Sequence, residues 1–153
     1  MLLVLLIGGA TLTVCLAIQV LALIIVLRYL LRSAAHRSEA TSVLADLGAI
    51  CFVAMTSFVG HLVQAAIWAL LFLRLDQFED FQTAYYHSLV NLSSLGYGDL
   101  VMDPPWRLLG AMEAAGGVLL FGVTAGALLA IMHSIFSQRG AIKELNRPAD
   151  PSD

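Results

Sequence analysis

The fold is decided by the segment Asp80-Phe-Gln-Thr-Ala-Tyr-Tyr-His-Ser-Leu-Val-Asn-Leu-Ser-Ser-Leu-Gly-Tyr-Gly-Asp99, which fits neither a membrane span nor an ordinary loop. Residues 80–93 predict a helix of about 20 Å with Asp80 as its N-cap. A helix of this length cannot cross a bilayer, and it can enter one only where protein covers its end. Directly after it, Gly96 and Gly98 stand two residues apart, as a row of carbonyls facing one axis requires, because glycine adopts positive φ at little cost.

Long apolar runs flank this segment and place the chain in a membrane. Of the 153 residues, 59% are apolar and 12% are charged, and the mean hydropathy is +0.86. A soluble domain of this size would expose too much apolar surface, and a disordered chain would carry more charge. The runs long enough to span a bilayer, which takes about 20 residues, cover 1–31, 43–74 and 105–137. We therefore predict an all-α integral membrane protein with three transmembrane helices and a re-entrant helix and loop between the second and third.

The charges of the connecting segments predict how these spans are oriented. Basic residues gather in the loop 32–42 and in the first part of the tail 138–153, whereas acidic residues prevail between the second and third spans. By the positive-inside rule, the loop and the C-terminus are cytoplasmic and the N-terminus lies outside. We predict a multi-pass protein of a cell membrane, of the bacterial inner-membrane type, which is surrounded by lipid and whose last residues, 146–153, form a frayed end. A net charge of −3 offers no basic surface to nucleic acid.

The sequence Ser94-Leu-Gly-Tyr-Gly-Asp99 resembles the Thr-Val-Gly-Tyr-Gly-Asp filter signature of potassium channels, with Ser in place of Thr and Leu in place of Val. The resemblance covers a pore domain over residues 43–137, whose last helix resembles the pore-lining helix of bacterial two-helix potassium channels. Its parts would be an outer helix 43–74, a pore helix 80–93, a filter 94–99 and an inner helix 105–137, with 1–31 as an extra helix. The resemblance implies a homotetrameric, potassium-selective channel that conducts K⁺ passively, with no enzymatic activity and no cofactor besides the permeant ion.

The resemblance also implies roles for individual residues. The residues of the implied selectivity filter are Ser94, Leu95, Gly96, Tyr97, Gly98 and Asp99. The Ser94 hydroxyl and the carbonyls of residues 94–97 would bind K⁺, the Tyr97 side chain would brace the filter, and Asp99 would lie at the outer mouth. Gly117 falls where the family carries its gating-hinge glycine, and a close approach between helices explains it equally well. Because serine is freer about χ1 than threonine, a weakly selective monovalent cation channel remains the alternative function.

Glu113 is an acid within the third span, where a carboxyl group is costly unless it is paired or protonated. We predict that it bonds the pore helix, at Tyr85, His87 or Asn91, and supports the filter from behind. The alternative is that it reaches the headgroup region.

His61 and Gln64 share one face of the second span, because residues three apart are neighbours on a helix. This predicts an interhelical hydrogen bond, with proton sensing by the imidazole as the alternative. Trp68 and Trp106, near the outer ends of their spans, suit the aromatic belt at a membrane surface.

Two rival functions remain from the sequence. One is a non-conducting assembly partner of another channel. The other is a non-conducting membrane redox or metal protein, which would use histidines that our predicted topology puts at different depths. These histidines are His36, His61, His87 and His133.

Overall fold

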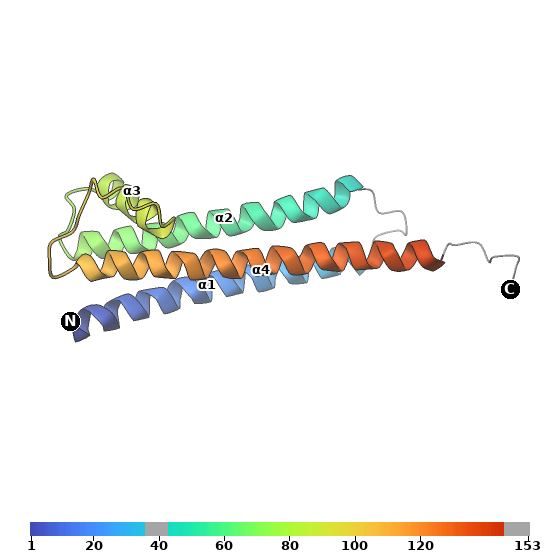
Figure 1. Cartoon of the computed structure of the whole chain (residues 1–153), viewed down its shortest axis with the longest axis horizontal. Helices are drawn as coiled ribbons and strands as arrows, with labels where there is room; N and C mark the ends of the chain where they lie inside the picture. Colours follow the sequence, from blue (N-terminus) through green and yellow to red (C-terminus); the bar gives the residue numbers. More distant parts are fainter. Residues whose placement is uncertain (36–42, 146–153) are drawn as a thin grey trace, which may run out of the picture.

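The computed structural model describes residues 1–35 and 43–145, which form four helices and no strand (Figure 1). The last part of the predicted loop 32–42, residues 36–42, and the end of the predicted tail, 146–153, lie outside the described residues. The first helix continues to Ala35, beyond its predicted end at 31, because residues 32–35 contain no helix-breaking residue. The helices are α1 (Leu2–Ala35), α2 (Val43–Arg74), α3 (Phe81–Leu92) and α4 (Arg107–Leu145). Three of them are long and apolar enough to cross a membrane, over Leu2–Leu30, Val43–Arg74 and Arg107–Ser137. The chain is an all-helical, multi-pass membrane protein.

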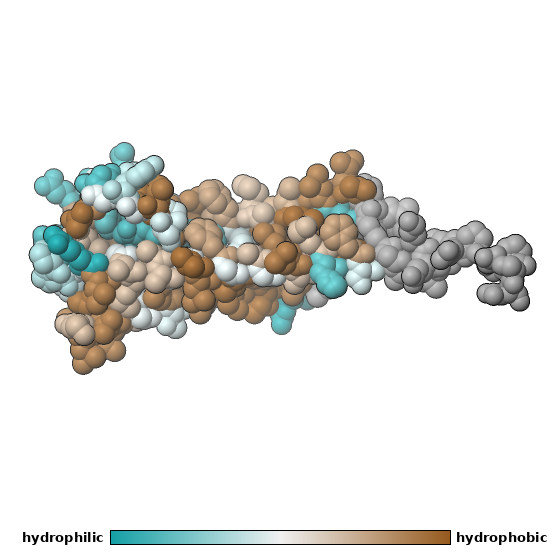
Figure 2. All heavy atoms as spheres, in the orientation of Figure 1, coloured by the Kyte–Doolittle hydropathy of each residue, from teal (hydrophilic) through white to brown (hydrophobic). Residues whose placement is uncertain are grey.

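The three long helices run side by side, and the short α3 packs against α2 and α4 at one end of the bundle (Figure 1). The N-terminus lies at the same end as α3, whereas α4 ends at the opposite one. Figure 2 shows hydrophobic residues along the length of the bundle and hydrophilic ones gathered at the α3 end. The predicted arrangement of the spans agrees with this placement; which end faces the cytoplasm stays a prediction.

The inner helix differs from the prediction at both ends. It begins at Arg107 rather than 105, because the chain first makes a turn in which the Trp106 N–H donates to the Asp103 carbonyl at 2.9 Å. It continues to Leu145 rather than ending at 137, although the apolar span within it ends at Ser137, as predicted. Apolarity marks where the bilayer ends and says nothing of where a helix ends. Residues 138–145 are mostly good helix formers without proline, so the helix extends beyond the span.

The core lies where α3 folds back over the C-terminal half of α2. The residues buried together there are Trp68 and Phe72 of α2, Leu92 of α3, and Leu109 and Leu120 of α4. Trp68 has no exposed surface, so its predicted place in an interfacial belt is wrong. The physical reason is the short helix α3, which packs against the C-terminal half of α2 and covers Trp68 with protein.

Candidate functional site

A capped start fixes the position of α3. The Asp80 carboxylate accepts hydrogen bonds from the Thr83 N–H at 2.9 Å and from the Thr83 hydroxyl at 2.7 Å. These bonds lower the pKa of Asp80, because they favour its charged form. The predicted N-cap is therefore confirmed. From this cap, at the hydrophilic end of the bundle, α3 runs with its C-terminal end pointing inward (Figure 1).

The loop after α3 alternates in backbone hand. Ser94, Gly96 and Gly98 have φ values of 58°, 58° and 74°, with the residues between them on the ordinary side. The alternation predicted for the two glycines is confirmed, and it includes Ser94. Positive φ strains a residue that carries a side chain, at a cost of about 1–2 kcal/mol.

The C-terminal end of α3 holds Ser94 in this strained conformation. Its N–H donates to the Asn91 carbonyl at 2.7 Å, and its hydroxyl donates to the Ala114 carbonyl of α4 at 3.3 Å. The next N–H, of Leu95, donates to the Val90 carbonyl at 3.0 Å. Because the hydroxyl proton points at α4, the lone pairs of the Ser94 oxygen stay open to another partner.

The carbonyl oxygens of residues 94–98 are not paired with any of the residues that the structure describes. Among the hydrogen bonds of the described residues, no donor reaches a carbonyl of residues 94–98. The side chains do not cover the loop either, since Leu95 and Tyr97 are 56% and 67% exposed. Unpaired carbonyls at membrane depth are costly unless water or a cation meets them. The loop therefore presents a row of acceptors that a cation can use.

A hydrogen bond between Tyr86 and Asp99 ties the far end of the loop back to α3. The Tyr86 hydroxyl donates to the Asp99 carboxylate at 2.7 Å. This bond is the main reason why the pKa of Asp99 is lowered and that of Tyr86 is raised. Sequence reasoning missed Tyr86, because a local pattern cannot show how far back the loop returns.

Glu113 meets α3 from behind. Its side chain has no exposed surface, and one carboxyl oxygen is hydrogen-bonded to the Ser88 hydroxyl. Contact with the pore helix is therefore confirmed: besides Ser88, the side chain of Asn91, one of the predicted partners, interacts with the Glu113 carboxyl group. The other two predicted partners, Tyr85 and His87, are wrong, since the Tyr85 hydroxyl donates to the Leu62 carbonyl of α2 and the ring of His87 lies 2.8 Å from the Asn91 amide nitrogen.

Comparison with protein families gives one result. The model of the family described as "Ion channel" matches residues 50–134, which is more than half of the chain. The chain belongs to this family of two-helix, potassium-channel-type pore domains. The match begins within α2 and ends within α4, so it includes α3 and the loop after it and leaves α1 out. Comparison with curated proteins and with solved structures gives no match.

Gly117 of this ion channel lies against the re-entrant helix. A Cβ atom built at this position would come within 1.9 Å of the Leu92 carbonyl oxygen. The close approach considered for Gly117 is therefore present, and it is made to backbone rather than to a side chain. Gly122, one and a half turns further along α4, has no atom within 4 Å of such a Cβ. A role of Gly117 as a hinge stays a prediction.

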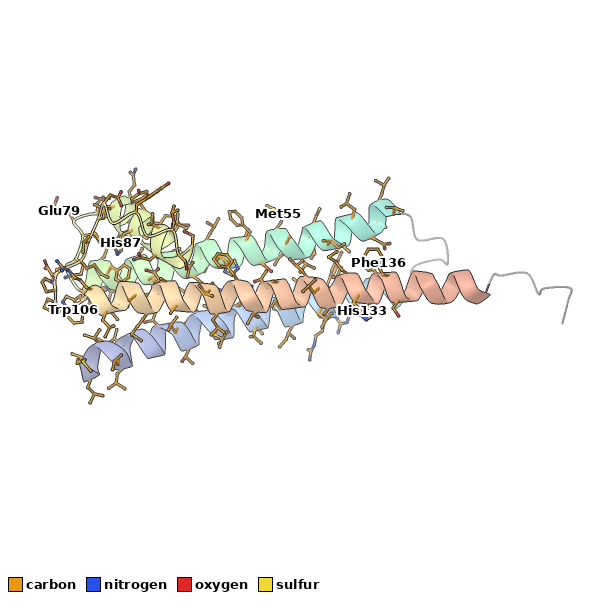
Figure 3. The ribbon with its side chains drawn as sticks, in the orientation of Figure 1. Met55, Glu79, His87, Trp106, His133 and Phe136 are labelled. Atoms are coloured by element: carbon orange, nitrogen blue, oxygen red, sulfur yellow. The ribbon has the colours of Figure 1, made fainter. Side chains whose placement is uncertain are left out.

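The histidines of the channel are spread along the bundle. Figure 3 shows His87 at the α3 end and His133 far along α4 toward the other end. His61 is buried in α2, and His36 lies outside the described residues. Within residues 1–35 and 43–145, no three His, Cys, Asp or Glu side chains come together as a metal site would require.

Proposed function

We propose that this chain is the subunit of a homotetrameric, potassium-selective channel that conducts K⁺ passively and catalyses no reaction. The observation that carries the proposal is the alternating backbone of residues 94–98, with its unpaired carbonyl row. One chain supplies one such row, and one row cannot surround an ion. A closed ring of identical subunits completes the site, and four copies is the number that the resemblance to potassium channels implies.

In this proposal the carbonyls of residues 94–97 replace the hydration shell of K⁺, with the Ser94 hydroxyl oxygen at the innermost position. The C-terminal end of α3 carries partial negative charge and favours a cation at the centre of the membrane. Asp99, held by Tyr86, supplies negative charge at the outer mouth. The C-terminus and the segment 36–42 face the cytoplasm, following the positive-inside rule.

Tracer uptake of K⁺ into liposomes that contain this chain alone tests the proposal. The variant Gly96→Ala places a side chain at a φ of 58° and should abolish uptake, because alanine avoids that conformation. Gly122→Ala is the matched control, since it adds the same methyl group to open space outside the loop, and should keep uptake. Equal uptake by the native chain and Gly96→Ala would contradict the proposal.

Chemical cross-linking in the same liposomes tests the number of subunits and should give a ladder that ends at four. Uptake by this chain alone would also exclude a mere assembly partner.

Weak selectivity among monovalent cations is the second candidate, and it is favoured by Ser94 standing where the family signature has threonine. Without the methyl group, the innermost oxygen is less firmly held. Reversal potentials in mixed K⁺ and Na⁺ separate the two candidates. If Ser94 limits selectivity, Ser94→Thr should raise the preference for K⁺; a native chain that already excludes Na⁺ would rule this candidate out.

A further inference from the structure

A buried cluster of polar side chains joins the three membrane-spanning helices halfway along the bundle. We call it the polar cluster; its members are Gln19 of α1, His61 and Gln64 of α2, and Thr124 of α4. Gln19 and Gln64 have no exposed surface, and His61 is 5% exposed. Gly60 of α2 makes room for it, because a Cβ there would lie 2.9 Å from the Gln19 carbonyl oxygen. None of these groups belongs to the filter or to its support.

One backbone carbonyl fixes the direction of most hydrogen bonds in the polar cluster. The Cys15 carbonyl can only accept, so the Gln64 group 3.3 Å from it must be the amide nitrogen. That nitrogen also donates to the Gln19 oxygen at 2.9 Å, and the Gln19 nitrogen then donates to the Thr124 hydroxyl oxygen at 2.9 Å. The other end of the Gln64 amide is its oxygen, which faces His61 Nδ1 at 3.0 Å. His61 therefore carries a proton on Nδ1 in its neutral form.

The Thr124 hydroxyl is the one group of the polar cluster whose proton can be donated to either of two acceptors. Its oxygen lies 3.2 Å from His61 Nε2 and 3.1 Å from the Leu120 carbonyl, one turn earlier in α4. Nε2 of a neutral imidazole with a proton on Nδ1 is an acceptor, so Thr124 donates to it. If Nε2 gains a proton it becomes a donor, and Thr124 must turn its own proton to Leu120. Both hydrogen bonds lie within reach of the Thr124 hydroxyl in this structure, so the proton can turn to either acceptor.

We propose that His61 is a proton-binding site that acts on α4 through the Thr124 hydroxyl. A proton passes from a hydronium ion to Nε2: an N–H bond forms, an O–H bond of the hydronium ion breaks, and water is released. The Thr124 hydroxyl keeps its own proton and turns it from His61 to the Leu120 carbonyl. A threonine that bonds the carbonyl four residues earlier promotes a bend in its helix, here between Leu120 and Thr124. The effect on conduction rests on the proposed function, in which α4 lines the pore.

The surroundings of His61 can accept the added charge. The ring of Phe121 lies 4.5 Å from the imidazole, centroid to centroid, and an aromatic face favours a cation. The titratable groups that the helices packed against α2 carry in their halves beside the filter end include Cys15 of α1, Tyr85 of α3 and Glu113 of α4. Tyr85 donates to the Leu62 carbonyl, and Glu113 lies about 16 Å from Thr124 along α4. No hydrogen bond of the described residues joins His61 to an acid.

The first test compares K⁺ uptake into liposomes at about pH 5 and pH 8, the range in which histidine titrates. For the native chain we expect the two rates to differ by about fivefold, the effect of one typical hydrogen bond. His61→Gln should remove this difference, whereas the matched control His133→Gln should keep it. Thr124→Ser should keep it, and Thr124→Val should remove it. A difference that persists in His61→Gln or Thr124→Val would overturn the proposal.

The second test measures the protonation and hydrogen bonding of His61 directly and does not depend on ion conduction. In bilayers, nitrogen NMR of labelled histidine should show one titrating ring in the native chain that is missing in His61→Gln. Its neutral Nε2 signal should shift in Thr124→Val, which has no hydroxyl to donate, and stay in place in Thr124→Ser. An unshifted signal, or a ring that does not titrate, contradicts the proposal. If the native chain shows no uptake at any pH, the proposed function fails, and this second test decides on the proton site by itself.

Discussion

Replacing Gly117 by alanine tests how α4 holds the re-entrant helix. The new methyl carbon would lie 1.9 Å from the Leu92 carbonyl oxygen, 2.8 Å from its carbonyl carbon and 3.1 Å from its Cα. All three are backbone atoms of the last turn of α3, so no side-chain rotation relieves the contact. The two helices would have to separate by more than about 1 Å, and overpacking of this kind costs about 1–3 kcal/mol. The displaced residue, Leu92, lies two positions before Ser94, the first residue of the filter loop, so we expect a loss of conduction as well.

Gly122→Ala is the control that isolates this steric effect. Both variants exchange a glycine for alanine in the same helix, so their intrinsic helix propensities change alike. Thermal unfolding in detergent should show Gly117→Ala less stable than Gly122→Ala by about 1–3 kcal/mol, and K⁺ uptake should be lost only in Gly117→Ala. Equal stability of the two variants, with altered uptake in Gly117→Ala, would refute the packing argument and favour a hinge at Gly117.

Variants at three further residues probe the surroundings of the filter. Ser88→Ala should lower the free energy of unfolding by about 1–3 kcal/mol, measured by thermal unfolding, because it removes the hydrogen bond between the Ser88 hydroxyl and the buried Glu113 carboxyl. Tyr86→Phe should raise the pKa of Asp99 toward its usual value. Since the bond to Asp99 stabilises the native chain above the usual pKa and is lost as the pH falls through the lowered one, the stability gap between the two chains should close in acid. Asp80→Ala should lower the melting temperature at neutral pH through loss of the cap on α3, with a gap that narrows in acid for the same reason. Asp80→Asn should still cap α3, and because asparagine carries no charge, the stability that this cap contributes should not change with pH.

The parts of this fold that follow from local patterns could be predicted from the sequence. Three spans follow from the lengths of apolar runs, and the backbone alternation at Gly96 and Gly98 follows from their spacing. The positive φ of Ser94 could not be predicted in this way, because it depends on bonds to the end of α3 and to Ala114. The spacing of the glycines identifies residues that tolerate positive φ, whereas Ser94 is held at positive φ by its neighbours and cannot be identified from spacing.

Contacts between elements were harder to predict, because they depend on how helices cross. An acid in a span predicts that Glu113 needs a partner, yet which of the neighbouring polar residues of α3 supplies it is a matter of rotation about the helix axis. That rotation aims Ser88 at Glu113 and turns Tyr85 toward α2. Tyr86 and Asp99 meet only because the loop returns along the outside of α3, and no periodic pattern encodes this return.

The first helix, α1, lies outside the family match, but it packs against α2 and α4 as part of the same helix bundle. Gln19 is fully buried and satisfies the Gln64 amide of α2, which would otherwise lose an acceptor in the middle of the membrane. Toward the N-terminal end of α1, Met112 of α4 fills the space that Gly8 leaves open, and Leu12 fills the space at Gly116. Gly116 faces a flexible side chain of α1, whereas Gly117 beside it faces the backbone of α3. This one pair of glycines thus lets α4 pack closely on the extra helix and on the re-entrant helix at the same level, so α1 and α3 are held against neighbouring positions of one helix.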